Sequence, residues 1–172
     1  MRNTRLTLLF LLLLAGFTLP SRSFAQNGLY VAYSGAALHN SGGQPNQYGP
    51  MVGLYLNNSY GKVVSAGVDF RASFLSGSNN TSLDTGLVGF RLAIRPRVLP
   101  ISPYGQLMIG VASSTLASKS NTDFAAAALV GVDYTLVPPV DWRVLELSYS
   151  RVNAVNPFNP VSLSTGIVLR FR

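Results

Sequence analysis

The strongest constraint on the fold is a pattern in which apolar side chains alternate with small, polar or charged ones. In residues 63–74, VVSAGVDFRASF, an apolar residue occupies every second position. Residues 86–95 and 124–136 have the same pattern, and after Gln26 no segment shows helical periodicity longer than a turn or two. Because successive side chains of a β-strand point to opposite faces, this pattern predicts an all-β fold.

Weaker alternating segments bring the expected number of strands to about eight. The length of each segment is close to the ~9–11 residues with which a tilted strand crosses a bilayer. They are residues 29–36, 48–56, 103–113, 143–151 and 161–171. The connections alternate between short or proline-containing turns and long polar loops, which are residues 37–47, 75–83, 114–121 and 153–160. This arrangement predicts an antiparallel up-and-down barrel with both termini at the end that carries the tight turns.

The polar face of these strands is unusual for a sheet in contact with water. It carries Gly, Ala and Ser with charges of both signs, and the chain has two lysines, Lys62 and Lys119. Charged residues make up 11% of the chain, against about 25% in typical soluble domains. We therefore expect a narrow interior in which arginines and carboxylates pair. The expected lumen charge network is Asp69, Arg71, Arg91, Arg95, Asp133, Glu146 and Arg170.

With the polar face inside, the bulky apolar residues point outward, which is stable in lipid. Lipid also excludes unpaired strand edges, so the sheet has to close on itself. The outward aromatic residues are Tyr48, Phe74, Phe124 and Tyr149 toward the long loops, and Tyr134 and Phe171 toward the tight turns. Two such bands mark the interfaces of membrane barrels. The alternative is a secreted β-sandwich, which the scarcity of lysine disfavours.

The last strand carries the most specific motif. In STGIVLRF, the residues Ser164, Gly166, Leu169 and Phe171 follow the order polar, any, Gly, any, any, apolar, any, aromatic. This motif resembles the C-terminal assembly signal of outer-membrane barrels, and the chain after residue 25 resembles the small OmpA/OmpX-type barrels. The chain departs from that pattern at Arg172, because the family usually ends on the aromatic residue.

The resemblance implies an integral protein of a Gram-negative outer membrane. It also implies that the barrel-assembly machinery closes the barrel during biogenesis. The partners that follow are outer-membrane lipid and lipopolysaccharide, and the sequence identifies no external ligand for the loops.

The N-terminal segment has the features of a secretory signal peptide. Two arginines precede an apolar run over residues 6–19, and Ser-Phe-Ala at 23–25 fits a signal-peptidase site. The run is shorter than the ~20 residues that span a bilayer as a helix. We therefore expect residues 1–25 to be cleaved and residues 26–172 to form one barrel domain. Since the chain has no cysteine, disulfide and thiolate chemistry are excluded.

Candidate catalytic residues are few. The single histidine, His39, lies in the first expected long loop, and the second loop, residues 75–83, lacks an adjacent Asp-Ser pair. Small barrels that modify lipid A use either a loop histidine with such a pair or a histidine and serine on a strand, and no predicted strand contains histidine. We expect no catalytic site, cofactor or metal site, because one histidine and scattered acids do not form one. Nucleic-acid binding is disfavoured because the arginines alternate into the sheet interior.

These observations favour a structural or surface-interaction role, exerted through the long loops of a rigid barrel. About eight strands leave an interior just wide enough for side chains to fill it. The alternative is a narrow pore for small solutes or ions, and a lipid A-modifying enzyme is the third hypothesis.

Overall fold

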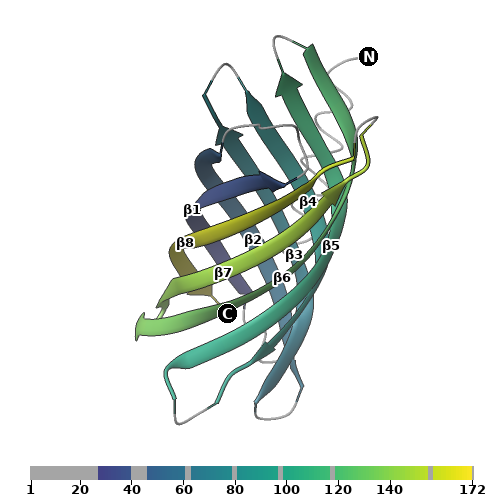
Figure 1. Cartoon of the computed structure of the whole chain (residues 1–172). Helices are drawn as coiled ribbons and strands as arrows, with labels where there is room; N and C mark the ends of the chain where they lie inside the picture. Colours follow the sequence, from purple (N-terminus) through teal and green to yellow (C-terminus); the bar gives the residue numbers. More distant parts are fainter. Residues whose placement is uncertain are drawn as a thin grey trace, which may run out of the picture.

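The computed structural model describes residues 27–39, 46–60, 63–78, 81–96, 99–116, 119–154 and 157–171. They form one closed barrel of eight antiparallel strands in chain order (Figure 1). The strands are β1 (Asn27–His39), β2 (Gln47–Tyr60), β3 (Val64–Ser76), β4 (Ser82–Ile94), β5 (Ile101–Leu116), β6 (Lys119–Val137), β7 (Val140–Val152) and β8 (Asn159–Phe171). The predicted all-β, up-and-down barrel is confirmed, and each expected strand lies largely or wholly within one observed strand. Within the described ranges there is no helix long and apolar enough to cross a membrane.

The barrel closes because β8 returns to pair with β1, and the register of this pair fixes the two ends of the molecule. Asn27 lies opposite Phe171 at one end, and His39 lies opposite Asn159 at the other. The first end also carries the turn at Pro138 and Pro139, which are joined by a cis peptide bond. We call it the turn end and the opposite end the loop end. Both described ends of the chain therefore lie at the turn end, as predicted.

The strands extend further into the long loops than the alternating pattern indicated. The expected loop at 114–121 is almost entirely a hairpin, because β5 continues to Leu116 and β6 begins at Lys119. The loops expected at 37–47, 75–83 and 153–160 are likewise shortened by the ends of β1, β3, β4 and β8. Backbone pairing with the neighbouring strand continues through these polar residues, and in the hairpin the Ser113 and Ser120 hydroxyls also lie 3.1 Å apart.

One consequence concerns the histidine. His39 is the last residue of β1 and not a loop residue, so the expectation that no strand contains histidine is wrong. Pairing of β1 with β8 continues as far as Asn159, which holds this end of β1 in an extended conformation. The His39 side chain lies outside the described part of the chain, and so do Arg172 and residues 1–25, which we expect to be a signal peptide.

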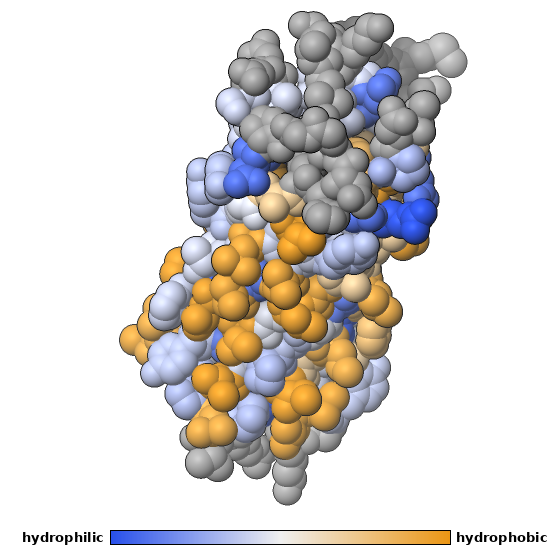
Figure 2. All heavy atoms as spheres, viewed as in Figure 1, coloured by the Kyte–Doolittle hydropathy of each residue, from blue (hydrophilic) through white to orange (hydrophobic). Residues whose placement is uncertain are grey.

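The outer wall of the barrel is apolar over most of its height. Leu107, Val130 and Tyr33 are each at least 60% exposed, and apolar residues of all eight strands share this orientation. Figure 2 shows hydrophobic residues covering the middle and lower part of the visible face, with hydrophilic residues toward the top. An apolar surface of this extent exceeds what soluble monomers expose. The alternation predicted from the sequence therefore places the apolar side chains outside and the polar ones inside.

The interior is filled in layers. At the loop end an apolar layer closes the lumen, and we call it the apolar cap: Ala36, Leu75, Leu83, Ala112, Ala125 and Val152. Below it lie charged residues and three buried tyrosines, Tyr30, Tyr55 and Tyr104. The barrel has room for these rings because each lies across a glycine of a neighbouring strand.

The tyrosine–glycine pairs are set by strand register. Tyr30 lies opposite Gly53, and Tyr104 lies opposite Gly131. A Cβ atom at either glycine would overlap the ring of its tyrosine, and Gly28 stands in the same relation to Tyr55. Glycine is therefore required at these positions by the close approach of a ring, and the rings cover the glycine backbone from the lumen side.

Candidate functional site in the barrel interior

The centre of the lumen holds a buried network of arginines and carboxylates. Arg71 on β3 binds Glu146 on β7 through two hydrogen bonds of 2.7 and 3.1 Å. Arg91 on β4 donates to Asp133 on β6 at 3.0 Å. Arg143 joins these two pairs, because its Nε lies 3.1 Å from Asp133 Oδ1 and one of its terminal nitrogens lies 3.2 Å from Glu146 Oε2.

Asp69 completes the network from β3. It accepts hydrogen bonds from the Tyr30 hydroxyl at 2.8 Å and from the Gln106 amide at 3.0 Å. It also lies 3.8 Å from nitrogens of both Arg71 and Arg91. We call Asp69, Arg71, Arg91, Asp133, Arg143 and Glu146 the central network. Its three positive and three negative side chains balance, which is what burial of charge requires.

The tyrosine rings cover the flat faces of the arginines. The Arg91 guanidinium carbon lies 3.7 Å from the ring centre of Tyr104 and 4.4 Å from that of Tyr55. The Arg143 guanidinium lies 4.1 Å above the Tyr30 ring. Cations over aromatic faces gain energy when both are desolvated, so the rings stabilise charges that have left water. The Tyr104 hydroxyl in addition donates to Glu146 at 2.6 Å.

A second cluster lies at the turn end of the lumen. Arg170 on β8 and Arg95 after β4 lie 2.8 and 3.6 Å from Asp141 on β7. The two arginines are 18–19% exposed, whereas the central network is closed to solvent. The structure therefore divides the seven predicted lumen charges. Five belong to the central network, and Arg95 and Arg170 pair with Asp141 at the turn end.

Arg143 and Asp141 are interior residues that the sequence pattern did not identify. Three positions separate Arg143 from Glu146, so strict alternation would place them on opposite faces. A register shift between these residues in the β7–β8 pairing reverses the alternation, and both side chains point inward. The signal in the sequence was composition, because Asp141 and Arg143 add a charge of each sign to the start of this strand.

Between the central network and the apolar cap lies a small chamber of about 40 Å³. Its walls are rich in hydroxyl groups, which come from Ser34, Ser73, Thr85, Ser148, Ser150, Ser162 and Ser164. Arg71 and Met51 line it at the level of the network. A space of this size holds a few water molecules, at about 10–15 Å³ each, and has no room for a larger solute.

The motif in the last strand takes part in closing the barrel. A Cβ at Gly166 would overlap the Val31 carbonyl oxygen and Ala32 on β1, so the glycine permits β8 to approach β1. Ser164 points into the lumen and donates to the Ser34 hydroxyl at 2.9 Å. Leu169 and Phe171 are exposed on the outer wall.

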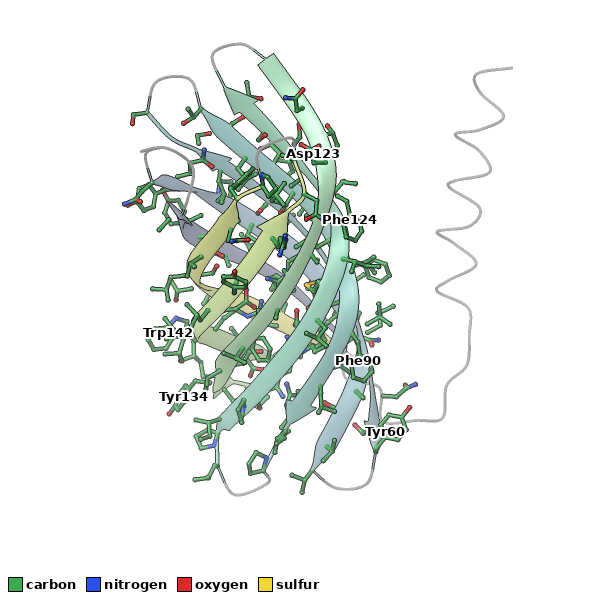
Figure 3. All side chains as sticks on the ribbon, turned by 45° about the vertical axis from the view of Figure 1, so that its right-hand side comes forward. Tyr60, Phe90, Asp123, Phe124, Tyr134 and Trp142 are labelled. Atoms are coloured by element: carbon green, nitrogen blue, oxygen red, sulfur yellow. The ribbon has the colours of Figure 1, made fainter. Side chains whose placement is uncertain are left out.

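All six aromatic residues expected at the membrane interfaces are exposed on the outer wall. Figure 3 shows Phe124 and Tyr134 projecting from β6 at different heights of the barrel. Phe124 lies toward the loop end of this strand and Tyr134 toward its turn end, since β6 runs from Lys119 to Val137. Trp142, the single tryptophan of the chain, also projects outward near the turn end.

No metal site is visible in the part of the chain that the structure describes. In these ranges, no three metal-ligating side chains gather into a group that could hold an ion. Asp84, the residue that follows the second expected loop, is exposed on the outer wall, on a strand remote from β1.

No protein-family model matches the chain, and no curated protein matches its sequence. The fold is similar to that of Neisserial surface protein A, with 21% identity and a TM-score of 0.55 over 86% of this chain and 97% of that one. It is also similar to Ail, the attachment invasion locus protein of Yersinia pestis, with 14% identity and a TM-score of 0.54 over 86% and 99%. A second structure of Ail contains the heparin analogue sucrose octasulfate. At these identities the similarity establishes the fold, which is that of the small outer-membrane barrels.

Proposed function

We propose that this chain, having the fold of small outer-membrane barrels, is an integral outer-membrane protein that acts as a sealed scaffold. Its role is structural or surface-interactive, and it presents the loop end to the outside and to lipopolysaccharide. The observation that carries this proposal is the combination of an apolar outer wall with a lumen filled by a neutral charge network under an apolar cap. Such a wall is stable in lipid, and such a lumen offers no path for solutes.

Several features of the sequence support the location. Residues 1–25 act as the signal that exports the chain, and residues 26–172 form the barrel. The six outward aromatic residues act as the two interfacial bands, and Ser164, Gly166, Leu169 and Phe171 act as the signal read by the barrel-assembly machinery. Separation of inner and outer membranes on a density gradient tests the location, and the protein is expected in the outer-membrane fraction.

Single-channel recording tests the seal. The protein is refolded from detergent into a planar bilayer, after a shift of the unboiled sample on a gel has shown that it is folded. We expect no steady conductance, while a channel-forming barrel added to the same bilayer confirms detection. A reproducible conductance from folded protein would overturn the sealed scaffold.

The second candidate function is a narrow pore, and the serine-lined chamber is the observation in its favour. The chamber gives the lumen a polar space at one level, with the apolar cap on its loop-end side and Arg71 on the other. Conductance that rises when Leu75 and Leu83 of the cap are both replaced by serine would identify the cap as a gate. We expect this double variant to show no conductance, because the central network still fills the lumen on the other side of the chamber.

A further inference from the structure

The outer wall carries two adjoining apolar hollows that a sealed scaffold does not require. Their volumes are about 700 and 590 Å³, and they lie over β4, β5, β6 and β7. Both are lined by Phe90, Leu107, Ala128 and Tyr149, so they form one continuous depression, which we call the wall groove. Figure 3 shows Phe90 projecting from the wall on this side of the barrel.

Strand register explains the shape of the wall groove. On β6 two outward alanines, Ala126 and Ala128, follow one another along the strand. Each lies between larger outward side chains of the neighbouring strands: Ile109 and Leu107 on β5, and Arg151 and Tyr149 on β7. The alanines therefore form a floor with side walls, and Gly105 on β5 extends this floor into the second hollow.

The loop-end rim of the groove carries a positive charge. Arg151 lines the first hollow, is exposed, and is one residue from the end of β7. Its Nε donates to the Asn153 side chain at 3.3 Å, and no carboxylate of the described residues lies within ion-pair distance of it. The five arginines that point into the lumen all have carboxylate partners.

We propose that the wall groove binds a single phosphorylated lipid of the outer leaflet. One acyl chain lies over Ala126 and Ala128, and the phosphate lies on the Arg151 guanidinium. The charge at the end of an apolar trough complements a molecule that carries an anion at the end of a hydrocarbon chain. The acyl chain gains dispersion contacts with Leu107 and Tyr149 that it lacks on a smooth wall. This inference rests on the proposed membrane location of the barrel.

Native mass spectrometry of the folded barrel in detergent micelles tests the site, with diphosphorylated and dephosphorylated lipid A as probes. The wild-type protein is expected to retain one diphosphorylated lipid and to bind the dephosphorylated form about tenfold more weakly, a difference of about 1.4 kcal/mol. R151Q is expected to remove this preference, and R151K to keep most of it. The double variant A126L/A128L fills the floor and is expected to lose both lipids.

A37L is the matched control for the groove. Ala37 also faces outward, but it lies on β1, on the far side of the barrel. This variant adds the same side chain and is expected to bind lipid as the wild type does. Equal binding by A37L and A126L/A128L would overturn the site, because the lipid would then adsorb without a preferred position. A dimer that A126L/A128L abolishes would assign the groove to a second copy of the chain instead.

The outcome is separable from that of the proposed function. The micelle experiment starts from protein shown by the gel shift to be folded, whatever its location in the cell. A folded barrel that shows no preference among the lipids contradicts the wall groove and leaves the sealed scaffold intact. A protein that fractionates away from the outer membrane contradicts the proposed function itself.

Discussion

Glu146 is the residue on which most of the central network depends. Arg71, Arg143 and Tyr104 all donate hydrogen bonds to it, and it is buried with them. A buried ion pair contributes little compared with an apolar pair of the same shape, but removal of one partner leaves the other charge without compensation. The effects of substitution at this residue are therefore larger than a count of its hydrogen bonds indicates.

Replacement of Glu146 by leucine leaves Arg71 and Arg143 without their shared carboxylate. We expect E146L to lower the free energy of unfolding by about 3–5 kcal/mol. Urea titration of the folded barrel measures the loss, with the fluorescence of Trp142 as the signal. D84N is the control, since Asp84 is exposed, and we expect it to change stability by less than about 0.5 kcal/mol. Equal stability of E146L and wild type would show that the network does not form.

Two buried tyrosines give a matched pair of substitutions. The Tyr104 hydroxyl donates to Glu146, whereas the Tyr55 hydroxyl has no hydrogen-bond partner among the described residues. We expect Y104F to destabilise the barrel by about 1–3 kcal/mol, because the buried carboxylate loses a hydrogen-bond donor. Y55F removes an unsatisfied group and is expected to be neutral or stabilising. The same urea titration compares them, and an equal loss in both variants would contradict this assignment.

At the scale of the strand, the period of two determined most of what the sequence could predict. It located all eight strands and the inward orientation of Arg71 and Arg91, because the backbone between the turns is regular. It missed Arg143 because the register shift in β7 has no signature in the alternation itself. It misjudged the β5–β6 hairpin because serine and threonine occur in loops and strands alike, and the pairing partner decides between them.

The positions of the inward glycines are a second feature that strand register explains and that alternation does not. G131A introduces a methyl group against the Tyr104 ring, which Arg91 and Glu146 hold in place. We expect a loss of about 1–3 kcal/mol from overpacking, measured as the shift in the urea midpoint. Gly86 faces outward, and a Cβ atom there would lie 4.0 Å from the Val111 side chain, an ordinary contact distance. G86A is therefore expected to be neutral or slightly stabilising. If the two variants unfold at the same midpoint, the ring is not confined by the glycine.

At the scale of the whole molecule, we propose that closure of the barrel and recognition during assembly use different residues of the same strand. Gly166 contacts β1 inside the closed barrel, whereas Phe171 lies on the outer wall next to the turn end. On this proposal the inward glycine permits the barrel to close, and the exposed aromatic residue is the one that the assembly machinery reads.

Two variants separate these steps. G166V places a branched side chain against Val31 and Ala32, and we expect it to abolish the gel shift both after refolding in detergent and in cells. F171S removes an outward ring, and we expect it to refold in detergent while its amount in the outer membrane falls severalfold. Measurement of both yields for both variants checks the distinction. Normal membrane levels of F171S would remove Phe171 from the assembly signal.

The ion pairs of the central network also bear on how the sheet curls into a barrel and enters the membrane. Arg71 and Glu146 belong to β3 and β7, which are four strands apart and face each other across the lumen. Their contact exists only when the sheet has curled far enough for opposite walls to meet. An unpaired arginine within a bilayer raises the free energy. Insertion of an open sheet, whose arginines lack these partners, is therefore unfavourable. We therefore expect insertion and curling to be coupled, with the buried charges favouring entry into the membrane only after opposite walls of the barrel have met.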